Sequence, residues 1–178
     1  MDSIPNFKTD ADRDATASIR GYVYQIYQSV YAWMQLKDNE LLVLEGAEDF
    51  DVHDRLSVVT TQIKDVANNI TLRSSAVIDT LNNYWTNKER NPDYDIVLRF
   101  LTTSEAGQEQ GSPFGAGLKG LIYWQSAESN YIDIELLRSF LLTLELSQNL
   151  HLFITNATQD ELRDQLIRRI KWDLGNKQ

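Results

Sequence analysis

The sequence predicts a single mixed α/β (α+β) domain, because segments with helical and with strand-like hydrophobic periodicity alternate along it. Its 178 residues are 42% hydrophobic, which is enough for one core, and two domains would each be near the lower size limit. Residues 1–14 are polar and acidic, so we expect the folded domain over residues 15–178.

The first half of the chain predicts a helix that leads into a β-hairpin. Apolar residues recur every three or four positions over 15–37, as in an amphipathic helix. Strands are predicted over 40–45 and 56–64, with the acidic segment 48–52 between them.

The second half predicts further helices and strands around one long loop. The glycine-rich stretch 104–117 predicts a mobile surface loop. The last helix begins at Thr158 and Glu161, whose spacing is that of a capping box. Helices are predicted from residue 74 or 75 onward and over 118–127, 132–146 and 159–174, and strands over 94–103 and 150–155.

Composition excludes several kinds of site. The chain has no cysteine, which excludes disulfides, thiol nucleophiles and cysteine-held metals. Its two histidines, His53 and His151, lie far apart in the sequence, so we exclude a multi-histidine metal site. Any metal ion must therefore bind to oxygen ligands.

The charge distribution limits the partners. A net charge of −9, from 26 acids and 17 bases, argues against a protein that binds nucleic acid simply by covering phosphates with cations. Residues 161–178 nevertheless carry more bases than acids. The chain has no secretion signal and no run near the ~18 apolar residues of a membrane span, so we expect a soluble, cytoplasmic protein.

A polar triplet ends the second predicted strand. Because side chains alternate along a strand, Gln62 and Lys64 project from the same side. The hairpin would bring them close to the acidic segment. A carboxylate and an amide oxygen can hold a hard divalent cation, while a lysine supports a water nucleophile and offsets developing charge. This constellation suits hydrolysis of a phosphodiester.

The acidic segment offers several metal-binding carboxylates. If the chain is extended there, Glu45, Asp49 and Asp51 share one face and Glu48 lies opposite. Whether Asp49 or Asp51 is the main ligand stays open at this point.

Three features in order carry a resemblance to a known family. They are R-G-Y-V-Y-Q at residues 20–25, L-E-G-A-E-D-F-D at 44–51 and Q-I-K at 62–64. Together they resemble the nuclease domain of the PD-(D/E)XK superfamily. The most similar branch is the Mrr-like one found at the N-terminus of bacterial antiphage effectors, such as the nuclease of CBASS defence.

The resemblance implies a restriction-endonuclease-like core, in which helices flank a mixed sheet on both sides, and cleavage of double-stranded DNA with Mg²⁺ or Mn²⁺. Asp49 matches the family's metal-binding aspartate, and Lys64 matches its catalytic lysine. Gln62 stands where many members have Glu or Asp. Gln25 matches a first-helix position that supplies a Glu or Gln to the site, and Glu45 matches an acidic position that would add a second ligand.

Two departures from the family pattern affect the metal. The residue before Asp49 is Glu48 rather than proline, and Gln62 removes one negative charge from the site. We therefore expect weaker metal binding and one tightly held ion rather than two.

Several cations are candidates for DNA contact, although a solvated helix face balanced by acids is an equal alternative. They are Arg73, Arg163, Arg168, Arg169 and Lys171. Aromatic residues crowd the first helix, which favours core packing or a subunit interface. We accordingly expect a homo-oligomer.

Other functions remain open from the sequence alone. Effectors of this kind usually join the nuclease to a sensor or ATPase module, so we expect this chain to be the N-terminal part of a longer protein. The alternative function is an inactive nuclease-like domain that serves as an interaction or oligomerisation module. An RNase is a third possibility.

Overall fold

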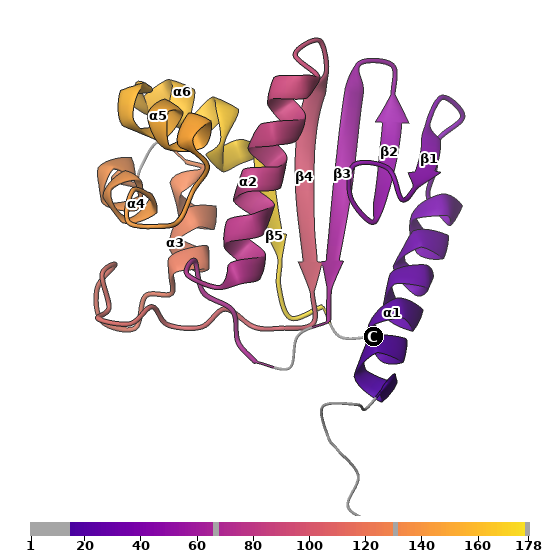
Figure 1. Cartoon of the computed structure of the whole chain (residues 1–178), viewed down its shortest axis with the longest axis horizontal. Coiled ribbons are helices and arrows are strands. Elements are labelled where there is room, and N and C mark those ends of the chain that lie inside the picture. The colour runs from indigo at the N-terminus through magenta and orange to yellow at the C-terminus, as the bar shows by residue number, and fades with distance from the viewer. Residues whose placement is uncertain (1–14, 66–67, 130–131, 177–178) are drawn as a thin grey trace, which may run out of the picture.

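A computed structural model describes residues 15–65, 68–129 and 132–176 and has a mixed α+β fold (Figure 1). The segment 1–14 lies outside the described residues. The strands are β1 (Leu41–Leu44), β2 (Phe50–Asp54), β3 (Ser57–Lys64), β4 (Asp95–Thr102) and β5 (Ile170–Asp173). The helices are α1 (Ala15–Met34), α2 (Ser75–Arg90), α3 (Gly120–Ala127), α4 (Ile134–Leu141), α5 (Gln148–Asn156) and α6 (Gln159–Gln165).

The strands form one sheet in chain order, and two kinds of pairing meet at β3. β1, β2 and β3 are antiparallel, with Phe50 opposite Thr61 and Asp51 opposite Thr60. β3, β4 and β5 are parallel, so helical crossovers connect them. The start of β2 therefore lies beside the end of β3.

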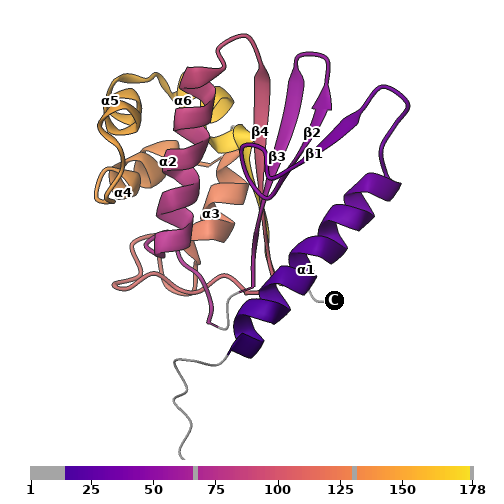
Figure 2. The ribbon, with the colours of Figure 1, turned by 45° about the vertical axis from the view of Figure 1, so that its right-hand side comes forward.

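Helices cover both faces of the sheet, as Figure 2 shows. α2 and the helices α3 to α6 enclose the main core on one face, where Leu81 and Leu98 are fully buried. α1 lies on the other face over a small cluster that includes Tyr24, Phe50 and Ile63. Among the described residues, no helix has both the length and the apolar character needed to span a membrane.

One predicted strand is a helix. The segment 150–155 belongs to α5, where Leu150 and Ile154 are four residues apart and both fully buried. Between them, Phe153 stacks on Trp85 of α2 with ring centroids 4.3 Å apart. The prediction was wrong because an apolar run this short fits either a buried strand or a buried helix.

The predicted helix over 159–174 ends early. α6 begins at the predicted capping box of Thr158 and Glu161 but stops at Gln165, and a 3₁₀ turn then leads into β5. β5 pairs with β4 and completes the sheet. The segment 170–173 is a strand because it forms hydrogen bonds to β4, about 70 residues earlier in the chain. Such distant pairing cannot be predicted from local periodicity.

The glycine-rich segment 104–117 has no helix or strand, as predicted, but only part of it lies at the surface and the rest packs into the fold. Phe114 is buried and stacks on Tyr123 at 4.8 Å. Glu109 is also buried, and its Oε1 accepts a hydrogen bond from the backbone amide of Leu72 at 2.6 Å. These contacts fix the segment despite its glycines.

Candidate active site

The candidate site lies at the start of β2, between α1 and α2. The Asp49 carboxylate accepts hydrogen bonds from Gln25 Nε2 of α1 at 2.6 Å and from the Ile63 backbone amide of β3 at 2.5 Å. Burial raises the pKa of Asp49, and the Glu45 carboxylate raises it further. The Ile63 hydrogen bond and the Lys64 ammonium lower this pKa. The fold thus brings Gln25, Asp49 and Lys64 together.

Glu48 lies on the α2 side of the same site. Asn83 of α2 is hydrogen-bonded to its carboxylate, while the buried Oε1 has no hydrogen-bond partner in the part of the chain that the structure describes. Burial raises the pKa of Glu48 to about 7, and the charge of Asp49 adds to this rise. Lys64 opposes it. Glu48 is not among the site residues predicted from the sequence, although its position directly before Asp49 was a signal.

Gln62 is buried and points toward α2. Its Oε1 accepts a hydrogen bond from Thr80 Oγ1 at 2.5 Å. The next residue, Ile63, packs with Tyr24 on the opposite face. The predicted alternation of side chains along β3 is therefore confirmed at these two residues, and Thr80 holds the Gln62 amide on the α2 side.

The predicted grouping of Glu45, Asp49 and Asp51 on one face is wrong for Asp51, whereas Glu45 and Asp49 line the same groove. The chain between β1 and β2 is a hairpin turn, not an extended segment, because Glu45 has φ 53° and its amide bonds to the Asp49 carbonyl at 3.2 Å. Asp51 faces α2 and lines a cavity with Asn87. Its carboxylate accepts a hydrogen bond from the Ala47 amide at 2.6 Å. Asp49 is consequently the aspartate whose pKa responds to Lys64.

Glu45 and Asp49 lie along a groove between α1 and β1. The other groove residues are mostly apolar, and they include Ile26, Trp33 and Leu44. Glu45 itself is exposed. A ligand that reached Asp49 from this side would pass an apolar wall.

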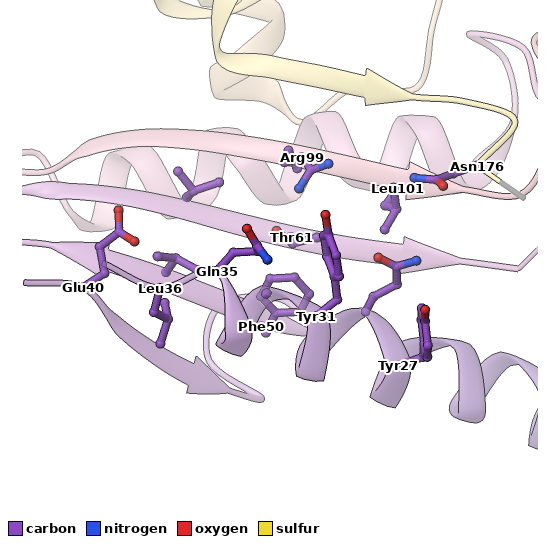
Figure 3. A pocket seen from close by; sticks show the side chains of 14 residues that line it. Tyr27, Tyr31, Gln35, Leu36, Glu40, Phe50, Thr61, Arg99, Leu101 and Asn176 are labelled. Atoms are coloured by element: carbon purple, nitrogen blue, oxygen red, sulfur yellow. The ribbon is translucent and has the colours of Figure 1, made fainter. Parts of the chain in front are cut away.

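A larger cavity separates the C-terminal half of α1 from the sheet and is shown in Figure 3. Its volume is about 630 Å³, and its lining includes Tyr31, Gln35 and Thr61. Arg99 also lines it, but its Nε is paired with the Asp173 carboxylate at 2.6 Å. The carboxylates of the candidate site do not line this cavity.

The cations predicted to contact DNA mostly bind groups within the chain. Arg163 is buried and donates a hydrogen bond to the Ile132 carbonyl at 3.0 Å, which excludes it as a DNA contact. Arg73 is exposed, and its guanidinium lies 4.8 Å from the centre of the Phe140 ring. The ion-pair partners of the remaining three are Asp164 for Arg168, Asp95 for Arg169 and Glu128 for Lys171. The C-terminal cations therefore do not form an uncompensated basic face.

The side chains near Asp49 have oxygen donors of the kind that a hard cation prefers, although these donors are few. No group of three or more Asp, Glu or His side chains that could hold a metal occurs within residues 15–65, 68–129 and 132–176. Glu48, Asp49 and Gln62 have carboxylate and amide oxygens, which are the ligand types that Mg²⁺ prefers. In this structure Gln62 is hydrogen-bonded on the α2 side and Asp49 on the α1 side. Burial is the main cause of the raised pKa of both acids, repulsion from a neighbouring carboxylate adds to it, and Lys64 is the positive charge that opposes it. The buried Oε1 of Glu48 has no hydrogen-bond partner among the described residues, so it is free to accept one more polar contact.

Comparison of the chain with models of known protein families, with curated proteins and with solved structures gives no match. The resemblance to PD-(D/E)XK nucleases therefore stays a prediction from the residues.

Proposed function

We propose that this chain is a metal-dependent nuclease domain that hydrolyses phosphodiester bonds of double-stranded DNA. The observation that carries the proposal is the meeting of two half-buried acids, Glu48 and Asp49, with Lys64 at the junction of β2 and β3. Glu48 supplies the second negative charge that Gln62 does not. We further propose that the domain acts in the cytoplasm as the nuclease part of a bacterial antiphage effector that also has a sensor or ATPase module.

Each residue of the site has a distinct role in this proposal. Glu48, Asp49 and the Gln62 oxygen would hold Mg²⁺, which when bound neutralises negative charge on the phosphate. Lys64 offsets the charge that develops on the phosphate oxygens and orients the attacking water. Gln25 fixes the rotamer of Asp49 through the 2.6 Å hydrogen bond.

Cleavage of supercoiled DNA with and without Mg²⁺ tests the proposal. We expect Lys64→Ala to lower the cleavage rate by at least about 100-fold, as for the loss of a group that stabilises transition-state charge. Lys37→Ala is the matched control, since the Lys37 side chain is 78% exposed and pairs with Glu40 in the turn after α1. Cleavage by Lys64→Ala at the wild-type rate would contradict the assignment. Competition between DNA and RNA substrates separates a DNase from an RNase.

A second candidate function is a non-catalytic interaction module. Two observations favour it: the amide of Gln62 in place of an acid, and the large exposed apolar side chains of α1 such as Trp33 and Met34. A purified chain that binds DNA or itself, but never cuts with Mg²⁺ or Mn²⁺, would support this function instead.

A further inference from the structure

Helix α1 turns its large apolar side chains toward solvent rather than toward the sheet. On the sheet side, Tyr24 is buried and Ala32 packs against the same small cluster. The outer side bears exposed apolar residues along the helix, namely Ile19, Val23, Ile26, Val30, Trp33 and Met34. An ordinary surface helix has the reverse arrangement, with its apolar stripe on the core.

The contacts of α1 with its own sheet are limited. The buried cluster beneath it is small, and the cavity of about 630 Å³ lies under its C-terminal half (Figure 3). Most of the stability of a helix in a protein comes from packing of its apolar face. The packing that would stabilise α1 must therefore come largely from its outer side.

The exposed apolar area is large enough for a stable dimer. Tyr22 and Trp33, which do not line the cavity under α1, are 61% and 65% exposed. At about 150–250 Å² per aromatic side chain, these two leave roughly 200–300 Å² uncovered. The aliphatic residues of the outer side, with Leu41 and Leu44 of β1, bring this to about 800 Å² or more, which is what each partner of a standard protein interface buries.

Charge favours a second copy of the chain over a membrane or a charged partner. Arg20 is the one charged residue in the 20 residues of α1, and its Nε pairs with Asp65 at 2.5 Å. Two copies of a chain with net charge −9 repel each other over most of their surface, but an uncharged face avoids that repulsion. Helices that lie on membranes carry several basic residues on their polar face, and α1 does not.

We propose that a second copy of this chain packs on the outer face of α1 and forms a symmetric dimer. The interface consists of α1 and the neighbouring edge strand β1, whose Leu41 and Leu44 are also exposed. The groove between them reaches Asp49, so the second copy borders the candidate site. The dimer does not depend on nuclease activity.

The oligomeric state of the chain tests this proposal. Light scattering coupled to size-exclusion chromatography should give twice the 20.5 kDa mass of the chain at micromolar concentration, without DNA or Mg²⁺. The double variant Val23→Glu/Val30→Glu buries four carboxylates in each dimer, so we expect at least about a 100-fold higher dissociation constant and a monomer peak. Leu152→Glu is the matched control, because Leu152 is 51% exposed on α5, on the other face of the sheet.

Circular dichroism verifies that each variant is folded. A wild-type monomer would overturn the proposal, and so would a dimer that survives the double substitution in α1. If the wild-type chain stays monomeric but sediments with vesicles of phosphatidylcholine and phosphatidylserine, the proposal is wrong and the partner of α1 is a lipid surface.

Discussion

Replacing Glu48 with glutamine removes the charge of the most perturbed acid in the candidate site and keeps its shape. Burial raises the pKa of Glu48 from 4.5 to about 7, so the folded chain holds a proton that the unfolded chain releases between these two pH values. A raised pKa of this kind gives stability that is present below pH 4.5 and lost as the pH rises toward 7. The ionised Glu48 therefore lowers the stability of the folded wild-type chain at neutral and alkaline pH.

The size of this penalty follows from the pKa shift. A shift from 4.5 to about 7 corresponds to about 3 kcal/mol at full burial. Glu48 is half-buried, and solvent screening reduces the effect to about 1–2 kcal/mol. At about pH 8 we expect Glu48→Gln to be more stable than wild type by this amount, which in a chain of this length raises the melting temperature by a few degrees. Below about pH 4.5 the two should unfold alike.

Urea unfolding followed by tryptophan fluorescence measures the difference across this pH range, in the presence of EDTA so that bound metal does not contribute. Asp93→Asn is the matched control, since it makes the same acid-to-amide change at an exposed residue between α2 and β4. A Glu48→Gln variant that is less stable than wild type at about pH 8 would refute the reasoning. So would a difference in unfolding free energy between variant and wild type that is the same at about pH 8 as below about pH 4.5.

Two further predictions concern the support of the site. A Cβ added at Gly46 would lie 2.1 Å from Asp51 Oδ2, so Gly46→Ala should destabilise the chain by about 1–3 kcal/mol in urea unfolding. In α1, a Cβ added at Gly21 would have nothing within 4 Å, so Gly21→Ala should instead stabilise the chain by up to about 1 kcal/mol. Equal effects of the two substitutions on the unfolding free energy would contradict this account. Thr80→Val removes the donor to Gln62 Oε1 and should cost about 1–3 kcal/mol, whereas Thr80→Ser keeps the hydroxyl and should restore most of the loss.

Local sequence patterns correctly predicted features that depend on residues close together in the chain. The alternation along β3 placed Gln62 and Ile63 on opposite faces, and both lie there. The capping box at Thr158 marked the start of α6. The same patterns did not distinguish the buried helix α5 from a strand, because Leu150 and Ile154 lie in an apolar run that is too short to show its period.

Composition and periodicity were enough to predict the class of the fold and the kinds of ligand a metal could have here. Alternating periodicities required helices and strands, and a chain with no cysteine and two distant histidines leaves oxygen as the donor. Which acids meet depends instead on how the elements pack. The turn at Glu45 carries Glu48 to α2 and Asp49 to Gln25, a choice that depends on packing between segments distant in sequence.

The orientation of α1 was decided in the same way. Its periodicity predicts an amphipathic helix, but periodicity cannot say whether the apolar side meets the sheet or faces outward. The packing of Tyr24 against Phe50 and Ile63 fixes the helix with its larger apolar residues outside, because the small cluster beneath it has little room for them.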